Sequence, residues 1–376
     1  MDVELLNKVE ADQISSRQPL PDQYLGLDDE EMAGRIKQAR DLLGSQLLIL
    51  GHHYQRDEVI AFADRTGDSF KLARAAAGCG GADYIVFCGV HFMAESADVL
   101  SASHQQVILP DLAAGCSMAD MAAADQLELC WDELAALGVN DLVPVTYINS
   151  AASIKSFCGE HGGVVCTSSN AEATLRWAWE RGEKILFLPD QHLGRNTAYK
   201  MGVPLDEMVV WDPELAYGGI SLKNLRRARI VLWKGHCSVH TKFTVSQVQH
   251  VRHQHPDARV IVHPECTWDV VQAADESGST EHIIKQVANS EIGSTWAIGT
   301  ELHLVNRLAK AHGPDRHIMT LDPMGCLCST MFRVSPNHLL WILESLVAGT
   351  VHNQIVVPEH EKKWTRIALD RMLEIH

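Results

Sequence analysis

Residues 47–54, LLILGHHY, decide the fold, because an apolar run of strand length ends there in a polar pair, His52 and Tyr54. Similar runs recur between stretches of helical periodicity: DYIVFCGV, VILPD, LVPVTYIN, VVCTSS, KILFLPD, VVWD, RIVLWKG, RVIVHPE, TWAIGTE and IMTLDP. Strands that are apolar throughout are typical of parallel sheets covered by helices on both faces. We therefore expect an α/β protein.

The chemistry at the strand ends repeats three times. The polar pair returns as Tyr147 and Asn149 and again as His263 and Glu265. A small polar cluster that opens a helix follows each pair, and the clusters are Asp68-Ser69, Ser168-Ser169 and Ser279-Thr280. Repeats of about 100 residues are whole domains rather than solenoid units. The sequence predicts three similar αβα sandwich domains with parallel sheets, in a pseudo-threefold arrangement around a central site.

The length of the chain sets the expected domain boundaries. We place the three units at residues 1–120, 121–228 and 229–345, in keeping with an ordinary domain length of about 100–150 residues. Residues 356–376 have helical periodicity, and we expect this helix to pack on the first unit. The stretch 211–227, WDPELAYGGISLKNLRR, is longer than a boundary needs, so we interpret it as a surface insertion.

The position of the polar groups predicts where a ligand binds. Open parallel α/β sheets bind ligands beyond the carboxyl ends of their strands, where the polar pairs and the helix-opening clusters lie. If three such edges face one another, they form a single enclosed site. Each Ser, Thr or Asp alone is more simply a helix N-cap. The threefold recurrence favours a shared function for the set.

Charge and composition exclude some partners. The formal net charge of −16 and the lack of a basic cluster argue against nucleic acid, which is bound by grouped Lys and Arg. The first residues lack the basic start and apolar core of a secretory signal, and no run of about 18 apolar residues follows. We expect a cytoplasmic protein without a membrane partner. Its ten cysteines are then thiols or metal ligands rather than disulfides.

Three cysteines lie in glycine-containing turns at the ends of units: Cys116, Cys237 and either Cys326 or Cys328. Soft thiolates favour zinc or iron–sulfur clusters. A structural zinc site is normally closed by four ligands, whereas three separate thiolates suit a [4Fe-4S] cluster with one iron free for substrate. Packing in the core is the simpler interpretation of the other cysteines, which are Cys79, Cys88, Cys130, Cys158, Cys166 and Cys266.

The motifs, taken in order, resemble those of the quinolinate synthases, which make the pyridine ring of NAD. They are GHHYQ, GDSFKLAR, GVHFMAE, YINS, TSSNA, PDQHLG, GHCSVH, VHPEC, GST and CxCxxM, between about residues 47 and 343. The resemblance implies a [4Fe-4S] cluster held by Cys116, Cys237 and Cys328. Cys328 is chosen over Cys326 because Met follows the family's third ligand, as in CSTM; the chain departs here from the CxxCxxC ending of some members.

The resemblance also implies a reaction and its partners. The family condenses iminoaspartate with dihydroxyacetone phosphate to quinolinate, with loss of phosphate and two waters, and the cluster acts as a Lewis acid. The partners are these two small molecules, together with a transient contact with an aspartate-oxidising enzyme.

The matching positions give the expected site residues. Glu265 is the only carboxylate in the strand-end pairs and is the expected general base. The other catalytic residues are Tyr54, Tyr147, His52 and His240. Substrate is expected to contact His52, Ser69, Tyr147, Asn149, Ser168, His263, Glu265, Ser279 and Thr280. Hydroxyls at helix N-termini suit phosphate and carboxylate groups.

Two other classes of protein also fit parts of the pattern. A zinc hydrolase would use Cys116, Cys237 and Cys328 with a histidine such as His240 or His263. A non-catalytic iron–sulfur sensor would need the cysteines alone. A sensor, however, has no need of so many polar groups at the ends of strands.

Overall fold

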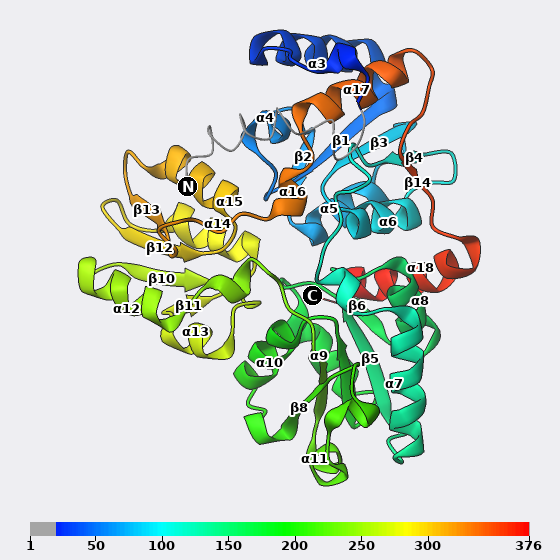
Figure 1. Cartoon of the computed structure of the whole chain (residues 1–376), viewed down its shortest axis with the longest axis vertical. Helices are drawn as coiled ribbons and strands as arrows, with labels where there is room; N and C mark the ends of the chain where they lie inside the picture. The colour runs from blue at the N-terminus through cyan, green and yellow to red at the C-terminus, as the bar shows by residue number, and fades with distance from the viewer. Residues whose placement is uncertain (1–19, 376) are drawn as a thin grey trace. The chain divides into compact units, whose positions relative to one another are not determined.

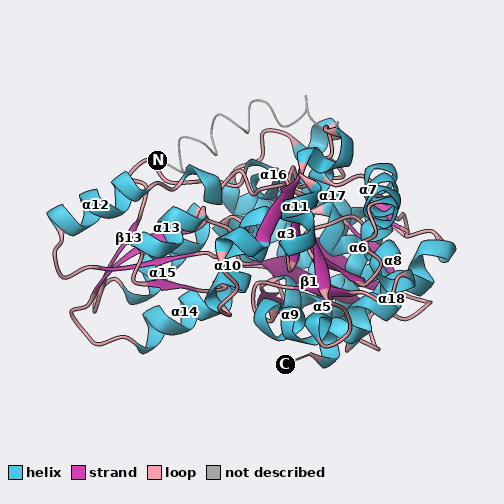
Figure 2. Ribbon diagram, turned by 90° about the horizontal axis from the view of Figure 1, so that it is seen from below, coloured by secondary structure: helices cyan, strands magenta, loops and turns pink. Residues whose placement is uncertain are grey.

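The computed structural model describes residues 20–375 of the 376-residue chain. Its strands form two sheets of five and one of four, and among the described strands only the pairing of β14 with β4 is antiparallel. Helices flank the sheets (Figures 1 and 2). The predicted α/β class, with three predominantly parallel sheets, is confirmed. None of the helices in residues 20–375 is both long and apolar enough to cross a membrane.

The chain divides into two compact units. One contains residues 20–115, Leu302–Arg307 and Pro323–Val356 and carries the first sheet. The other contains Cys116–Glu301, Leu308–Asp322 and residues 357–375 and carries the second and third sheets.

The first sheet has the strand order β14-β4-β3-β1-β2. Its strands are β1 (Leu47–His52), β2 (Arg65–Gly67), β3 (Tyr84–Cys88), β4 (Gln106–Ile108) and β14 (Gln354–Ile355). The helical segments of this unit are η1 (Asp22–Tyr24), α3 (Asp29–Leu43), η2 (Gly44–Gln46), α4 (Asp57–Ile60), α5 (Ser69–Ala77), α6 (His91–Leu100), α16 (Ser329–Phe332) and α17 (Pro336–Val347). Because β1 ends at His52, the predicted polar pair lies at its carboxyl end.

The second sheet has the order β6-β5-β7-β9-β8, with α7 and α8 on one side and α9 and α10 on the other (Figure 1). Its strands are β5 (Leu142–Tyr147), β6 (Val164–Cys166), β7 (Lys184–Leu188), β8 (Met208–Trp211) and β9 (Ile230–Trp233). Its helical segments are η3 (Ala119–Met121), α7 (Ala124–Ala136), α8 (Ala152–Glu160), α9 (Ala171–Trp179), α10 (Gln191–Lys200), η4 (Leu205–Glu207), η5 (Ala216–Gly219), α11 (Leu222–Arg227) and α18 (Glu359–Glu374).

The third sheet has the order β11-β10-β12-β13, with α12 and α13 on one side and α14 on the other (Figure 2). Its strands are β10 (Arg259–Val262), β11 (Glu276–Ser277), β12 (Thr295–Gly299) and β13 (His317–Thr320). The helical segments are η6 (His240–Lys242), α12 (Val245–Gln254), α13 (Trp268–Ala273), α14 (Thr280–Asn289) and α15 (Leu302–His312), of which α15 continues from one unit into the other.

Two of the three predicted helix-opening clusters supply the N-cap. Asp68 Oδ1 accepts the Lys71 N–H at 2.9 Å, and Ser279 Oγ accepts the His282 N–H at 3.3 Å. The prediction is wrong for Ser168-Ser169, because the N-cap of α9 is Asn170. The Asn170 side chain instead accepts the Thr167 N–H at 2.8 Å, which closes a turn that contains both serines.

The predicted unit boundaries need three corrections. Strand β9 follows residue 228 but pairs with β7 and β8, so the boundary between the second and third sheets lies after Trp233. Helix α17 packs on α3 in the unit of the first sheet rather than in the third unit. Helix α18 packs on α8 and β6 of the second sheet, not on the first unit.

The stretch 211–227 is only partly the surface insertion that the sequence predicted. Trp211 and Leu225 lie in the hydrophobic core of the second sheet. Leu215 and Tyr217, between them, are 53% and 49% exposed. The interpretation is therefore wrong for both ends of the segment, because their apolar side chains complete the core beside β8 and β9.

Helix α18 approaches α8 closely through Gly159. A Cβ atom at this position would lie 2.0 Å from the carbonyl oxygen of Trp364, a backbone atom that cannot rotate away. We expect Gly159→Ala to lower the free energy of unfolding by about 1–3 kcal/mol, the usual effect of overpacking. Urea unfolding measures it. Gly34→Ala in α3 is the control, since nothing lies within 4 Å of its added Cβ. An equal loss of stability in both variants would contradict the steric explanation.

Candidate active site

The polar pair at the end of β10 is almost completely buried. His263 and Glu265 are each 2% exposed. Strand β10 lies between β11 and β12, so its carboxyl end is at the middle of the sheet edge. The His263 N–H donates to the Gly299 carbonyl of β12 at 3.1 Å. The third sheet thus presents an imidazole and a carboxylate at the edge where parallel sheets bind ligands.

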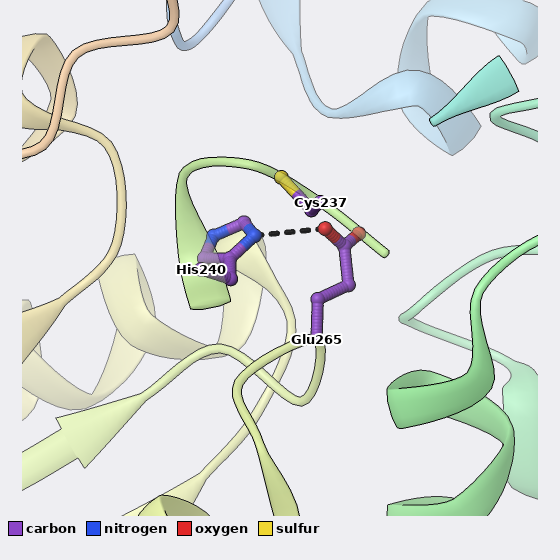
Figure 3. A group of neighbouring side chains, drawn as sticks. All are labelled: Cys237, His240 and Glu265. Atoms are coloured by element: carbon purple, nitrogen blue, oxygen red, sulfur yellow. Dashed lines mark hydrogen bonds and ion pairs between the residues drawn. The ribbon is translucent and has the colours of Figure 1, made fainter. Parts of the chain in front are cut away.

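Glu265 pairs with His240, the first residue of η6 (Figure 3). His240 Nδ1 lies 2.8 Å from Glu265 Oε2, and His240 Nε2 lies 3.2 Å from Thr300 Oγ1. An ionised carboxylate can only accept, so Nδ1 carries a proton in this contact. The ring of His240 also stacks on that of His263, with centroids 4.4 Å apart. These contacts fix the orientation of His240.

Burial and charge give the two strand-end groups defined protonation states. Burial alone would raise the pKa of Glu265, but His263, His240 and the Tyr147 hydroxyl together lower it below its ordinary value. Burial, aided by His240, lowers the pKa of His263 to about 3. At neutral pH Glu265 is therefore ionised and His263 is neutral.

The strand-end pair of the second sheet lies in the same unit. Tyr147 is 5% exposed, and its hydroxyl donates a hydrogen bond to Glu265. Asn149 Oδ1 is buried and finds no hydrogen-bond partner within residues 20–375. A buried acceptor without a partner is costly in a folded protein. The Asn149 side chain is therefore available to a bound molecule.

The predicted hydroxyl groups of this unit have different surroundings. Ser168 lines a cavity of about 520 Å³ together with Pro264, the residue between His263 and Glu265. Ser279 and Thr280 are buried at the start of α14, where the Ser279 hydroxyl already accepts the His282 N–H.

Three predicted side chains belong to the unit of the first sheet. His52 is 4% exposed, and its Nδ1 accepts the Tyr54 N–H at 3.1 Å. The two rings meet edge to face with centroids 4.8 Å apart. Ser69 is the first residue of α5. The predicted pair of β1 is thus preorganised within its own unit.

Exposure separates the predicted cysteine ligands from most of the others. Cys116, Cys237 and Cys328 are partly exposed, whereas Cys326 is 1% exposed. The predicted packing is found for the buried thiols Cys88, Cys130, Cys158, Cys166 and Cys266. Burial raises the pKa of Cys88 to about 12, which keeps such a thiol protonated and unreactive. The packing prediction is wrong for Cys79, which is partly exposed.

Met121 contacts the end of β9 and the turn that carries Cys237 through its carbonyl oxygen and its sulfur. The Trp233 indole N–H donates to the Met121 carbonyl at 2.6 Å. The His236 N–H points to Met121 Sδ at 3.4 Å, and the Asp120 N–H donates to the Cys116 carbonyl at 3.1 Å. The backbones of the turns that carry Cys116 and Cys237 are therefore fixed within the compact unit that carries the second and third sheets.

The sequence analysis missed two residues of this site. Thr300, directly after β12, contacts the His240 ring. Asp190 is fully buried, caps α10 through the Leu193 N–H at 2.6 Å, and receives the N–H of Cys237. Burial, and then the charge of Glu265, raise the pKa of Asp190 above its ordinary value. Asp190 follows a strand in FLPD, so its position at a strand end was the available signal.

The fold and the site define an α/β protein with a buried imidazole–carboxylate pair beside a cysteine. The sequence matches the family described as "Quinolinate synthetase A protein" over residues 34–374. It is 60% identical over 357 residues to the quinolinate synthase of Acidobacterium capsulatum, covering 94% of this chain and 95% of that protein. It is 55% identical over 360 residues to that of Corynebacterium glutamicum, covering 96% and 91%. The chain belongs to the quinolinate synthetase A family, which confirms the resemblance.

Proposed function

We propose that this enzyme condenses iminoaspartate with dihydroxyacetone phosphate to quinolinate, with loss of phosphate and two waters, in NAD biosynthesis. The name of its relatives, quinolinate synthase, supports the product. The observation that carries the proposal is the buried set of His240, Glu265 and Tyr147 at the ends of two sheets. A condensation that expels two waters needs groups that remove and return protons at fixed positions.

His240 is the group best suited to move a proton. A carboxylate whose pKa lies below its ordinary value, like that of Glu265, is a weak base. Its better use is to hold the Nδ1–H of His240 and to stabilise the imidazolium that forms when Nε2 takes a proton. Glu265 then acts through His240, which refines the expected role of general base. Tyr54, Tyr147 and His52 remain the proposed partners in proton transfer.

Polar groups at the strand and helix ends supply the proposed substrate contacts. Asn149 Oδ1 suits an N–H or O–H donor, because it is a buried acceptor without a partner among the described residues. Hydroxyls near helix N-termini suit phosphate and carboxylate groups. The proposed hydroxyl contacts are Ser69, Ser168, Ser279 and Thr280, and His52 and His263 are the proposed imidazole contacts.

We assign a [4Fe-4S] cluster to Cys116, Cys237 and Cys328. The donor set fits, because all three thiols are partly exposed and soft thiolates are the usual ligands of such clusters. The burial of Cys326 supports Cys328 as the third ligand. When bound, a cluster with three protein thiolates supplies a Lewis-acidic iron with an exchangeable position.

Family membership argues against the two other classes. Relatives that are named as synthases support neither a zinc hydrolase nor a non-catalytic sensor. We place the enzyme in the cytoplasm and retain the transient contact with an aspartate-oxidising enzyme. Imines hydrolyse in water, so direct receipt of iminoaspartate would limit its loss.

The test is product formation by protein purified without oxygen. Iron and sulfide are counted, and quinolinate and phosphate are measured after addition of iminoaspartate and dihydroxyacetone phosphate. We expect both products in equal amounts, and none after the iron has been removed by chelation. Protein with a full complement of iron and sulfide that forms no quinolinate would contradict the proposed reaction.

A further inference from the structure

Cys237, His240 and Glu265 offer three metal-ligand atoms within a small space. One atom from each residue, a thiol sulfur, a ring nitrogen and a carboxylate oxygen, lies within 4.8 Å of the other two. All three belong to the compact unit that carries the second and third sheets. A tetrahedral zinc ion, with bonds of about 2.0–2.3 Å, places its ligand atoms roughly 3.3–3.7 Å apart. We propose that these residues bind a divalent ion of the zinc class when the protein carries no cluster.

The protein already contains the outer contacts that such a site requires. A histidine that binds a metal usually donates its other ring N–H to an oxygen, which fixes the tautomer. His240 has this partner, because Thr300 Oγ1 lies 3.2 Å from Nε2. The other ring nitrogen, Nδ1, faces Glu265 and is the atom that would bind the ion. The Tyr147 hydroxyl holds the carboxylate of Glu265 in turn. Outer contacts of this kind orient the ligands of a metal and raise its affinity.

Binding needs only a small change in the side chains. The 2.8 Å contact between His240 Nδ1 and Glu265 Oε2 opens to admit the ion. The imidazole proton moves from Nδ1 to Nε2, where Thr300 Oγ1 accepts it, and Cys237 loses its thiol proton to solvent. Cys237 is partly exposed, which provides a path for the ion. Three protein ligands leave one position for water, as in open zinc sites.

The site shares Cys237 with the cluster assigned above. Competition between the ion and the cluster therefore rests on the proposed function. The Cys237 thiolate cannot bind a zinc ion at this site and an iron of the cluster at the same time. Zinc, which N and S ligands hold more tightly than iron(II), would then occupy the protein before a cluster is built. The ion would compete with cluster assembly by removing one of its three ligands.

Cobalt(II) is the probe that tests the site, because its thiolate complexes absorb in the near ultraviolet and tetrahedral ions give strong visible bands. Cluster-free protein, stripped by a chelator under argon, is titrated with Co²⁺. We expect one equivalent of Co²⁺ to bind and to produce both the thiolate bands and the visible bands of a tetrahedral ion. Added Zn²⁺ should displace the Co²⁺. Cys237→Ser should lose the thiolate band. Thr300→Val should weaken binding by about 10-fold or more, the usual effect of losing an outer partner of a ligand.

Cys116→Ser and Cys328→Ser are the matched controls and should keep the full cobalt spectrum. If either loses the bands as Cys237→Ser does, the ion lies among the three cysteines and the inference is wrong. Absence of any thiolate band in the unsubstituted protein would also overturn it. Circular dichroism establishes that each variant is folded.

Cluster rebuilding is measured separately on the same preparation. Protein preloaded with one equivalent of Zn²⁺ should take up iron and sulfide at least several times more slowly than metal-free protein. Equal rates would contradict the competition. Failure of the metal-free protein to take up a cluster would instead count against the proposed cofactor, whatever the cobalt titration shows.

Discussion

Cys237→Ser is expected to lose most of its iron and all quinolinate formation, and the same result is expected for Cys116→Ser and Cys328→Ser. Serine offers a hydroxyl that stays protonated and is a harder ligand than a thiolate, so it holds an iron–sulfur cluster poorly. The measurement is anaerobic purification followed by iron and sulfide counts and the quinolinate assay.

Cys326→Ser is the matched control, because Cys326 lies two residues from Cys328 in the same turn but is 1% exposed. This variant should keep most of its iron and should still form quinolinate. If Cys326→Ser loses the cluster while Cys328→Ser keeps it, the third ligand has been assigned to the wrong cysteine.

Apolar runs predicted the central strands of all three sheets. Strands β1, β5 and β10 end where the polar pairs indicated. The sequence analysis did not predict β2, β11 or β14, which are two or three residues long and lie at sheet edges. An edge strand of that length buries too few side chains to need an apolar run. Such strands form because a neighbouring strand offers hydrogen bonds, which no local pattern shows.

The boundaries between units were harder to predict than the strands. The repeat of strand-end chemistry indicated three sheets but not the sheet that each flanking segment joins. Strand β9 adds to the second sheet because its buried side chains, including Trp233, complete that core. Helix α18 joins the same sheet because Gly159 admits it closely and Thr365 Oγ1 donates to the Ala152 carbonyl at 2.9 Å. These choices depend on shape at contacts far apart in the sequence.

The sequence likewise predicted some residues of the site and not others. The strand-end spacing singled out Tyr147, His263 and Glu265, and the structure brings them close to His240. Thr300 was not singled out, because threonine after a strand is common and its role depends on the ring that it meets. The pKa of Glu265 could not be foreseen either, since it results from burial opposed by two imidazoles and a hydroxyl. Residue type predicted a base, whereas the lowered pKa of Glu265 and its contact with His240 support the proposal that it orients one.

Glu265→Gln is expected to keep its fold and its cluster but to lose turnover by about 10²–10⁴, the usual effect of removing a positioned acid–base group. Glutamine preserves the shape of the side chain. It removes the negative charge that holds the Nδ1–H of His240 and stabilises the imidazolium. The kcat of the quinolinate reaction, measured with iron counts on the same samples, reports the loss. Glu291→Gln, an exposed change of the same type, should leave kcat unaltered.

A double variant decides whether Glu265 acts alone or through His240. Residues that work as a unit give non-additive losses. If Glu265 orients His240, then Glu265→Gln combined with His240→Gln should be no more than about threefold slower than the slower single variant. Independent roles would instead multiply the two losses. Near-normal turnover by Glu265→Gln would show that neither the charge nor the basicity of this carboxylate is needed, and the proton-transfer assignment would have to move to Tyr147 or His52.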